Sequence, residues 1–154
     1  MTQTDKNIEI SQALYDEGCS CIVSNKDTRK FTRRGIDDLY YLLNNEPDFL
    51  HGAFVADRIV GKAAAALMIT GGVGSVYADL ISVSALTLLR NAGIETDYAQ
   101  VVTYIKNNRL TDWCPVEAMC YNEENLDDIL SIINHFEANK ERYFKPRQDA
   151  ADNK

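Results

Sequence analysis

Residues 57–93, DRIVGKAAAALMITGGVGSVYADLISVSALTLLRNAG, decide the fold of this chain. They contain, in order, an apolar helix, a glycine-rich break, an apolar strand and a second apolar helix, over residues 61–69, 70–74, 75–81 and 82–93. A helix that is apolar nearly all round must be buried, and a strand that is apolar nearly throughout is typical of a parallel sheet covered on both faces. Because another apolar strand follows over residues 98–105, this order predicts a βαβ unit.

Lys62 is the one charged side chain of the first of these helices, which otherwise runs through four consecutive alanines. The first turn of a helix leaves N–H groups without partners, and these groups favour a negative charge. The Lys62 ammonium group therefore either extends to water or pairs with an anion. The second helix begins at Ser82-Val83-Ser84, where hydroxyl groups suit a helix N-terminus.

The first 60 residues predict two helices and two hairpins. Apolar spacing indicates helices over residues 5–17 and 36–45, and the segments 19–24 and 28–33 form a hairpin around the turn Asn25-Lys26-Asp27. The returning strand of that hairpin is polar and basic, which is typical of a charged sheet edge. We expect a second hairpin in which residues 50–56 turn at Asp57-Arg58 and continue through Ile59-Val60.

The last third of the chain predicts two more helices. Cys114 is placed to cap a short helix with Pro115 at its first position and Glu117 in its first turn. Asn122 is placed to cap a final helix with an apolar stripe from Leu126 to Phe136. We expect one domain over residues 1–142 and a frayed tail over residues 143–154.

Composition narrows the classes of function. The chain has 154 residues, a net charge of -7 and 45% hydrophobic residues, which favours one acidic domain with a sizeable core. This charge argues against a surface that binds nucleic acid or an anionic membrane. The first residues lack the pattern of a signal peptide, and no apolar run approaches the roughly 18 residues that span a bilayer. We therefore expect a cytoplasmic protein.

The four cysteines, Cys19, Cys21, Cys114 and Cys120, are expected to be free thiols in such a compartment. Their spacings do not match the paired two-residue knuckle of a zinc site, so we expect no metal and no cofactor. Cys114 is the best candidate for a reactive thiol because a helix N-terminus lowers the pKa of a thiol. The other interpretation is a structural turn that packs Trp113.

The runs VADRIVGKAAAAL (55–67), ISVSALTLLRNAGI (81–94) and NNR (107–109) followed by WCPVEAM (113–119) resemble an uncharacterised bacterial family, DUF1893. The resemblance covers residues 14–121 and implies a cytidine-deaminase-like fold. It therefore implies a three-layer α/β/α sandwich with a mixed sheet, to which this chain adds a C-terminal helix.

In active deaminases, a His/Cys-Ala-Glu motif opens the first of the two helices and a Pro-Cys-x-x-Cys motif opens the second, supplying the zinc ligands and the proton-shuttling glutamate. This chain has Gly61-Lys62-Ala63-Ala64-Ala65 and Val83-Ser84-Ala85-Leu86-Thr87 at those places. Alanines and neutral hydroxyl groups cannot hold Zn²⁺ or activate its water. The resemblance therefore implies the fold without the zinc-dependent deaminase activity.

The same fold would direct both helix N-termini into one pocket, with free N–H groups beside Lys62 and the hydroxyl groups of Ser82 and Ser84. We expect this pocket to bind a small anionic ligand, such as a nucleotide or a phosphorylated metabolite. The candidate ligand-binding residues are Gly61, Lys62, Ser82, Ser84, Arg109, Cys114 and Glu117. Two alternatives stay open. One is a zinc-independent enzyme that uses Cys114 and Glu117, and the other is a ligand-free homo-oligomer, such as a dimer, packed through the alanine helix.

Overall fold

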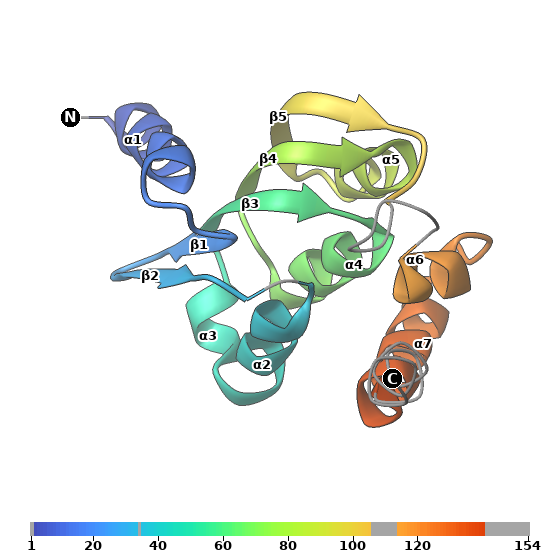
Figure 1. The fold of residues 1–154 in the computed structure, drawn as a ribbon. Helices are drawn as coiled ribbons and strands as arrows, with labels where there is room; N and C mark the ends of the chain where they lie inside the picture. Colours follow the sequence, from blue (N-terminus) through green and yellow to red (C-terminus); the bar gives the residue numbers. More distant parts are fainter. Residues whose placement is uncertain (1, 34, 106–113, 141–154) are drawn as a thin grey trace, which may run out of the picture.

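A computed structural model describes residues 2–33, 35–105 and 114–140. Five strands form one mixed sheet in the order β2-β1-β3-β4-β5 (Figure 1). Antiparallel pairing joins β2 to β1 and β1 to β3, whereas β3, β4 and β5 are parallel. The strands are β1 (Cys21–Ser24), β2 (Thr28–Phe31), β3 (Phe54–Val60), β4 (Ser75–Ser82) and β5 (Glu95–Val102). The prediction of an α/β fold with a mixed sheet is confirmed.

Seven helices are described: α1 (Gln3–Asp16), α2 (Asp37–Asn45), α3 (Pro47–Leu50), α4 (Lys62–Gly71), α5 (Val83–Asn91), α6 (Pro115–Cys120) and α7 (Leu126–Ala138). Two separate apolar clusters divide them between the faces of the sheet. The smaller cluster lies under α1 beside β1 and β3, and the larger holds the other helices against the opposite face. Figure 1 shows α1 apart from the other helices. Helical layers therefore lie on both faces, and the α1 layer covers only part of its face.

Helix α4 is the centre of the larger cluster. Eight of its ten residues are buried, including Lys62 and all four alanines. The methyl side chains keep the helix slim, so α2, α5, α6 and α7 all pack against it. Leu67 and Met68 are fully buried, and each contributes roughly 1.5–3 kcal/mol to folding. The helix ends at Gly72, whose left-handed backbone (φ 76°) permits the turn toward β4.

The expected hairpin at Asp57-Arg58 is wrong, because β3 runs straight through this pair. Both polar side chains find partners that let them lie within a strand. The Arg58 guanidinium donates to the carbonyl oxygens of Cys19 (2.7 Å) and Leu14 (3.0 Å), which ties α1 and its following turn to β3. Asp57 pairs with Cys21 across the ladder and points into the buried face.

Two other boundaries differ from the predictions. Strand β5 begins at Glu95, three residues before the expected start at Tyr98. The final helix is capped by Asn125 and not by Asn122, because the Asn125 side chain accepts a hydrogen bond from the Asp128 N–H (3.2 Å). The predicted tail over residues 143–154 lies outside the described residues. Among the helices of the described ranges, none combines the length and apolarity needed to cross a membrane.

Asp57 generates a prediction about stability and pH. Burial raises the pKa of Asp57 from 3.8 to about 7, against the opposing effect of the Ile59 and Arg58 N–H groups. Since the folded-state pKa lies above the unfolded one, the stabilisation exists at low pH and is lost as pH rises from about 4 through 7. We expect Asp57→Asn to remove this loss and to stabilise the protein at pH 8 by up to about 4 kcal/mol.

Urea unfolding at pH 5 and pH 8 measures this effect. The advantage of Asp57→Asn over the unsubstituted protein should be larger at pH 8 than at pH 5. An advantage that is equal at the two pH values, or larger at pH 5, would contradict the assignment.

Candidate functional site

The parallel register brings the starts of α4 and α5 together. Val60 pairs with Ile81, so the next residues, Gly61 and Ser82, leave the same edge of the sheet as neighbours. Each is the N-cap of the helix that follows it, and the two helices pack along their lengths. The geometry therefore places two helix N-termini side by side at the carboxyl ends of β3 and β4.

The carboxylate of Glu117 occupies the N-terminus of α4. The Lys62 N–H donates to Oε1 (2.8 Å) and the Ala63 N–H donates to Oε2 (3.0 Å). Gly61 has no side chain with which to cap α4. A carboxylate from α6 therefore satisfies two of the first N–H groups of α4. Glu117 is only 7% exposed, and these hydrogen bonds therefore lie in a largely dry environment.

Gly61 is needed for the closeness of this contact. A Cβ atom added at residue 61 would lie 2.3 Å from both the carboxyl carbon and Oε2 of Glu117. The Gly61 backbone (φ -100°, ψ -176°) is extended and open to any residue. The constraint at this position is therefore space for the carboxylate and not backbone conformation.

Lys62 does not extend to water. Its residue is only 6% exposed, and its ammonium group donates to the carbonyl oxygen of Tyr121 (3.2 Å). Burial raises the pKa of Glu117, whereas the two N–H donors and the positive charge of Lys62 act in the opposite direction. The net effect is a raised pKa of Glu117, because the carboxylate loses more hydration through burial than these interactions replace.

Ser82 and Ser84 stand at the neighbouring helix start. The Ser82 hydroxyl oxygen accepts from the Ala85 N–H (3.2 Å) and lies 3.3 Å from the Ser84 hydroxyl oxygen. Ser82 is buried, whereas Ser84 is half-buried. The Ser82 hydroxyl group therefore caps α5, and Ser84 is the more accessible of the two.

Cys114 is the N-cap of α6, as predicted, and its surroundings do not favour the thiolate form. Burial raises the pKa of Cys114, and this effect exceeds the lowering by the Glu117 and Val116 N–H groups. Burial likewise raises the pKa of Cys120 to about 12. Neither thiol is activated as a nucleophile by its surroundings. Arg109, the remaining candidate residue, lies outside the described residues.

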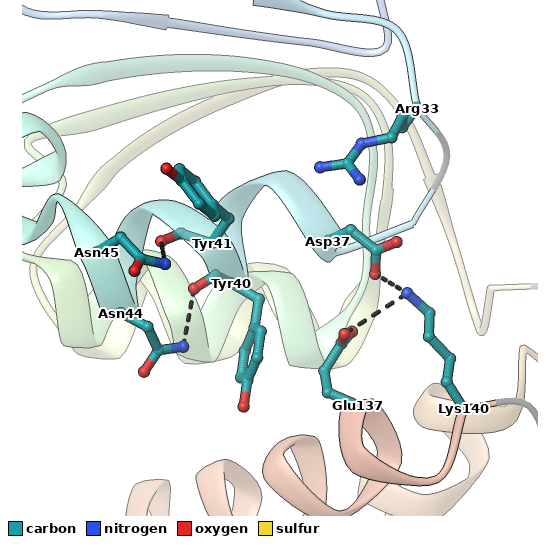
Figure 2. Close-up of a pocket in the computed structure, with 8 residues that line it drawn as sticks. All are labelled: Arg33, Asp37, Tyr40, Tyr41, Asn44, Asn45, Glu137 and Lys140. Atoms are coloured by element: carbon teal, nitrogen blue, oxygen red, sulfur yellow. Dashed lines mark hydrogen bonds and ion pairs between the residues drawn. The ribbon is translucent and has the colours of Figure 1, made fainter.

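A concavity lies between α2 and α7, away from these helix starts (Figure 2). This cleft has a volume of about 400 Å³ and is lined by Arg33, Asp37, Tyr40, Tyr41, Asn44, Asn45, Glu137 and Lys140. Both of its cations have acidic partners: Arg33 contacts Asp38 (2.5 Å), and Lys140 contacts Asp37 and Glu137. Burial and the neighbouring Asp37 carboxylate raise the pKa of Glu137. These pairings leave the cleft poorly suited to an anion.

Within residues 2–33, 35–105 and 114–140, no group of three or more His, Cys, Asp or Glu side chains is placed to hold a metal ion. The structure thus brings Gly61, Lys62 and Glu117 together and places Ser82 beside them. It adds two groups that sequence reasoning missed, the Ala63 N–H and the Tyr121 carbonyl, because backbone atoms carry no signal in the sequence.

The contact between Gly61 and Glu117 predicts a strongly coupled pair. Gly61→Ala should cost about 3 kcal/mol, because the new methyl group displaces the carboxylate from two charge-assisted hydrogen bonds. In a Glu117→Ala background the same substitution should cost less than about 1 kcal/mol. Urea unfolding of the four proteins of this double-mutant cycle measures the coupling. Additive effects would show that the carboxylate is not held against Gly61.

Cys114 is expected to be a slow thiol. Because burial raises its pKa, alkylation by iodoacetamide at pH 7.5 should be slower than that of free cysteine, with a midpoint in pH above the value of about 8.5 for a free thiol. Peptide mass spectrometry, with Cys114→Ser as the control for assignment, follows the reaction. Rapid labelling at pH 6 would instead indicate an activated nucleophile.

Comparison with known proteins places this geometry in a family. The family model described as a domain of unknown function (DUF1893) matches residues 9–136. The crystal structure of a DUF1893 family protein from Thermotoga maritima is similar to this fold, with a TM-score of 0.79 and 19% sequence identity over 88% of this chain and 92% of that chain. No curated protein matches the chain. Because the family model spans most of the sequence, the chain belongs to the DUF1893 family, as its motifs indicated.

Proposed function

We propose that this chain binds a small anionic ligand, such as a nucleotide or a phosphorylated metabolite, at the adjoining starts of α4 and α5. In the unliganded protein, Glu117 takes the place of the anionic group of the ligand. One observation carries the proposal: the first N–H groups of α4 hold a carboxylate that lies 55 positions further along the chain. A helix start that is left uncapped by its own residues and occupied by a carboxylate is chemically an anion site.

Exchange of Glu117 for a ligand has a physical reason. The raised pKa of Glu117 shows that its carboxylate loses more through burial than its hydrogen bonds and Lys62 return. Release of this carboxylate to water restores its hydration, and the phosphate or carboxylate oxygens of the ligand then accept from the same two N–H groups. In this proposal the Lys62 ammonium group and the Ser84 hydroxyl group are further donors to the ligand.

The proposal includes a cytidine-deaminase-like ancestry for this scaffold, which the resemblance of residues 14–121 supports. In that case, the place of the zinc ion and its water is taken by the Glu117 carboxylate. No step of zinc-dependent deamination follows from these residues, because alanines and hydroxyl groups stand at the helix starts. We propose binding, and not catalysis, as the role of the site.

The alternative of a subunit contact through the alanine helix is less well supported. All four alanines are buried within a single copy of the chain, where α2, α5, α6 and α7 cover them. A helix that its own chain already covers offers no surface to a second copy. The slimness of α4 is used to build the core, and any oligomer must form elsewhere.

Removal of the Glu117 carboxylate tests the proposal directly. Glu117→Ala should lower the melting temperature, and acetate or formate should restore part of it by entering the vacated anion site. Glu117→Gln is the matched control, because its amide fills the same space and should show no restoration. Thermal unfolding with and without the anions measures both variants.

A panel of nucleotides, sugar phosphates and dicarboxylates then identifies the ligand. A true ligand should bind Glu117→Ala at least about tenfold more tightly than the unsubstituted protein, because the competing carboxylate is gone. Lys62→Met should weaken that binding, whereas Lys30→Met, at an exposed ion pair with Glu17, should not. Equal affinity for both proteins, or no stabilisation of Glu117→Ala by any anion, would refute the proposal.

A further inference from the structure

The two edges of the sheet differ in how they are protected from other chains. Strand β2 is only four residues long and carries Arg29 and Lys30, each in an ion pair with a neighbouring glutamate. Short length and charged side chains are the usual means of blunting an edge. Strand β5, at the opposite edge, is eight residues long and contains no Lys, Arg, Pro or Gly. The β5 edge is therefore longer than the β2 edge, and its charged residues are limited to Glu95 and Asp97.

Strand β5 is also unusually open. Six of its eight residues are exposed, and no described residue pairs with its outer edge (Figure 1). Tyr98 is 39% exposed and Val101 is 41% exposed, and Val83, which directly follows the β4 residue paired with Val102, is 52% exposed. An edge without a described strand partner and exposed apolar side chains thus occur together at β5.

The distribution of charge along β5 fits a second copy in one orientation. Both acidic residues, Glu95 and Asp97, lie in the first half, and residues 98–102 are uncharged. Parallel, in-register pairing would set acid against acid, which is destabilising across a ladder. Antiparallel pairing about the middle of the strand sets the acidic half of each copy against the apolar half of the other.

We propose that two copies of this chain pair through β5 in an antiparallel, two-fold arrangement, joining their five-stranded sheets into one continuous sheet. A two-fold contact of this kind closes on itself, so the assembly stops at a dimer. A two-fold axis perpendicular to the sheet keeps each side chain on its own face, so one residue of the strand must lie opposite its own copy. We place the axis at Ala99, one of the two central residues of the strand. The proposal is independent of ligand binding, because β5 contributes no residue to the site at Glu117.

Light scattering of the full chain in a concentration series tests this arrangement. The mass should be twice 17.3 kDa at micromolar concentration. The double substitution Ala99→Lys and Val101→Lys should give a monomer with an unchanged circular dichroism spectrum, since both positions are exposed. The matched control is Tyr41→Lys, on an exposed tyrosine of α2 (52%), which should stay dimeric.

Cross-linking tests the orientation. Ala99→Cys should form an intermolecular disulfide under mild oxidation, whereas Ile8→Cys, exposed on α1, should not. A monomer at all concentrations would overturn the proposal. The proposal would also be overturned if the variant with both Ala99→Lys and Val101→Lys stayed dimeric, or if Ala99→Cys failed to cross-link the dimer. A measured mass that fits a complex with a different protein would overturn it as well.

Discussion

The structure depends on one carboxylate at the start of one buried helix. The first two turns of helix α4 are buried, so water cannot reach its first turn to satisfy the N–H groups. Glu117 supplies two oxygens to those groups from α6, and in doing so it fixes α6 against the centre of the core. Gly61 leaves the space for this contact, and the Tyr121 carbonyl receives the Lys62 ammonium at the end of the same short helix. These contacts thus join the start of α4, with Gly61 and Lys62, to α6 as one structural unit.

The balance of charge within this unit explains its proposed use. Lys62 and Glu117 carry opposite charges that burial would otherwise penalise. Backbone N–H groups of α4 donate to the Glu117 carboxylate, and the backbone carbonyl at the end of α6 accepts from the Lys62 ammonium group. The N–H groups and the lysine favour a negative charge at this place, and burial opposes it by raising the pKa of Glu117. The cleft between α2 and α7 lacks such an environment, because acidic side chains neutralise both of its cations.

The parts of this fold that depend on the local pattern of apolar and polar residues could be predicted from the sequence. The alanine helix, the apolar β4 and the serine start of α5 have periodicities that determine a βαβ unit with little ambiguity. Asp57-Arg58 was misinterpreted as a turn because both residues are polar, and nothing local shows that Arg58 reaches two carbonyl groups around α1. The residues Gly61, Lys62 and Glu117 were each selected as candidates, but their direct contact was not predicted, because it joins positions 55 apart. The raised pKa of Cys114 could not be predicted, because the helix position of this residue is visible in the sequence and its burial is not.

The most direct test of the central claim is an NMR titration of the backbone amides of Lys62 and Ala63. If Glu117 holds these N–H groups, both amide protons should shift as pH falls, with one shared midpoint above the usual value of about 4.3 for glutamate. The shift should vanish in Glu117→Gln. Amides that do not respond to pH, or that keep the same titration in Glu117→Gln, would contradict the account.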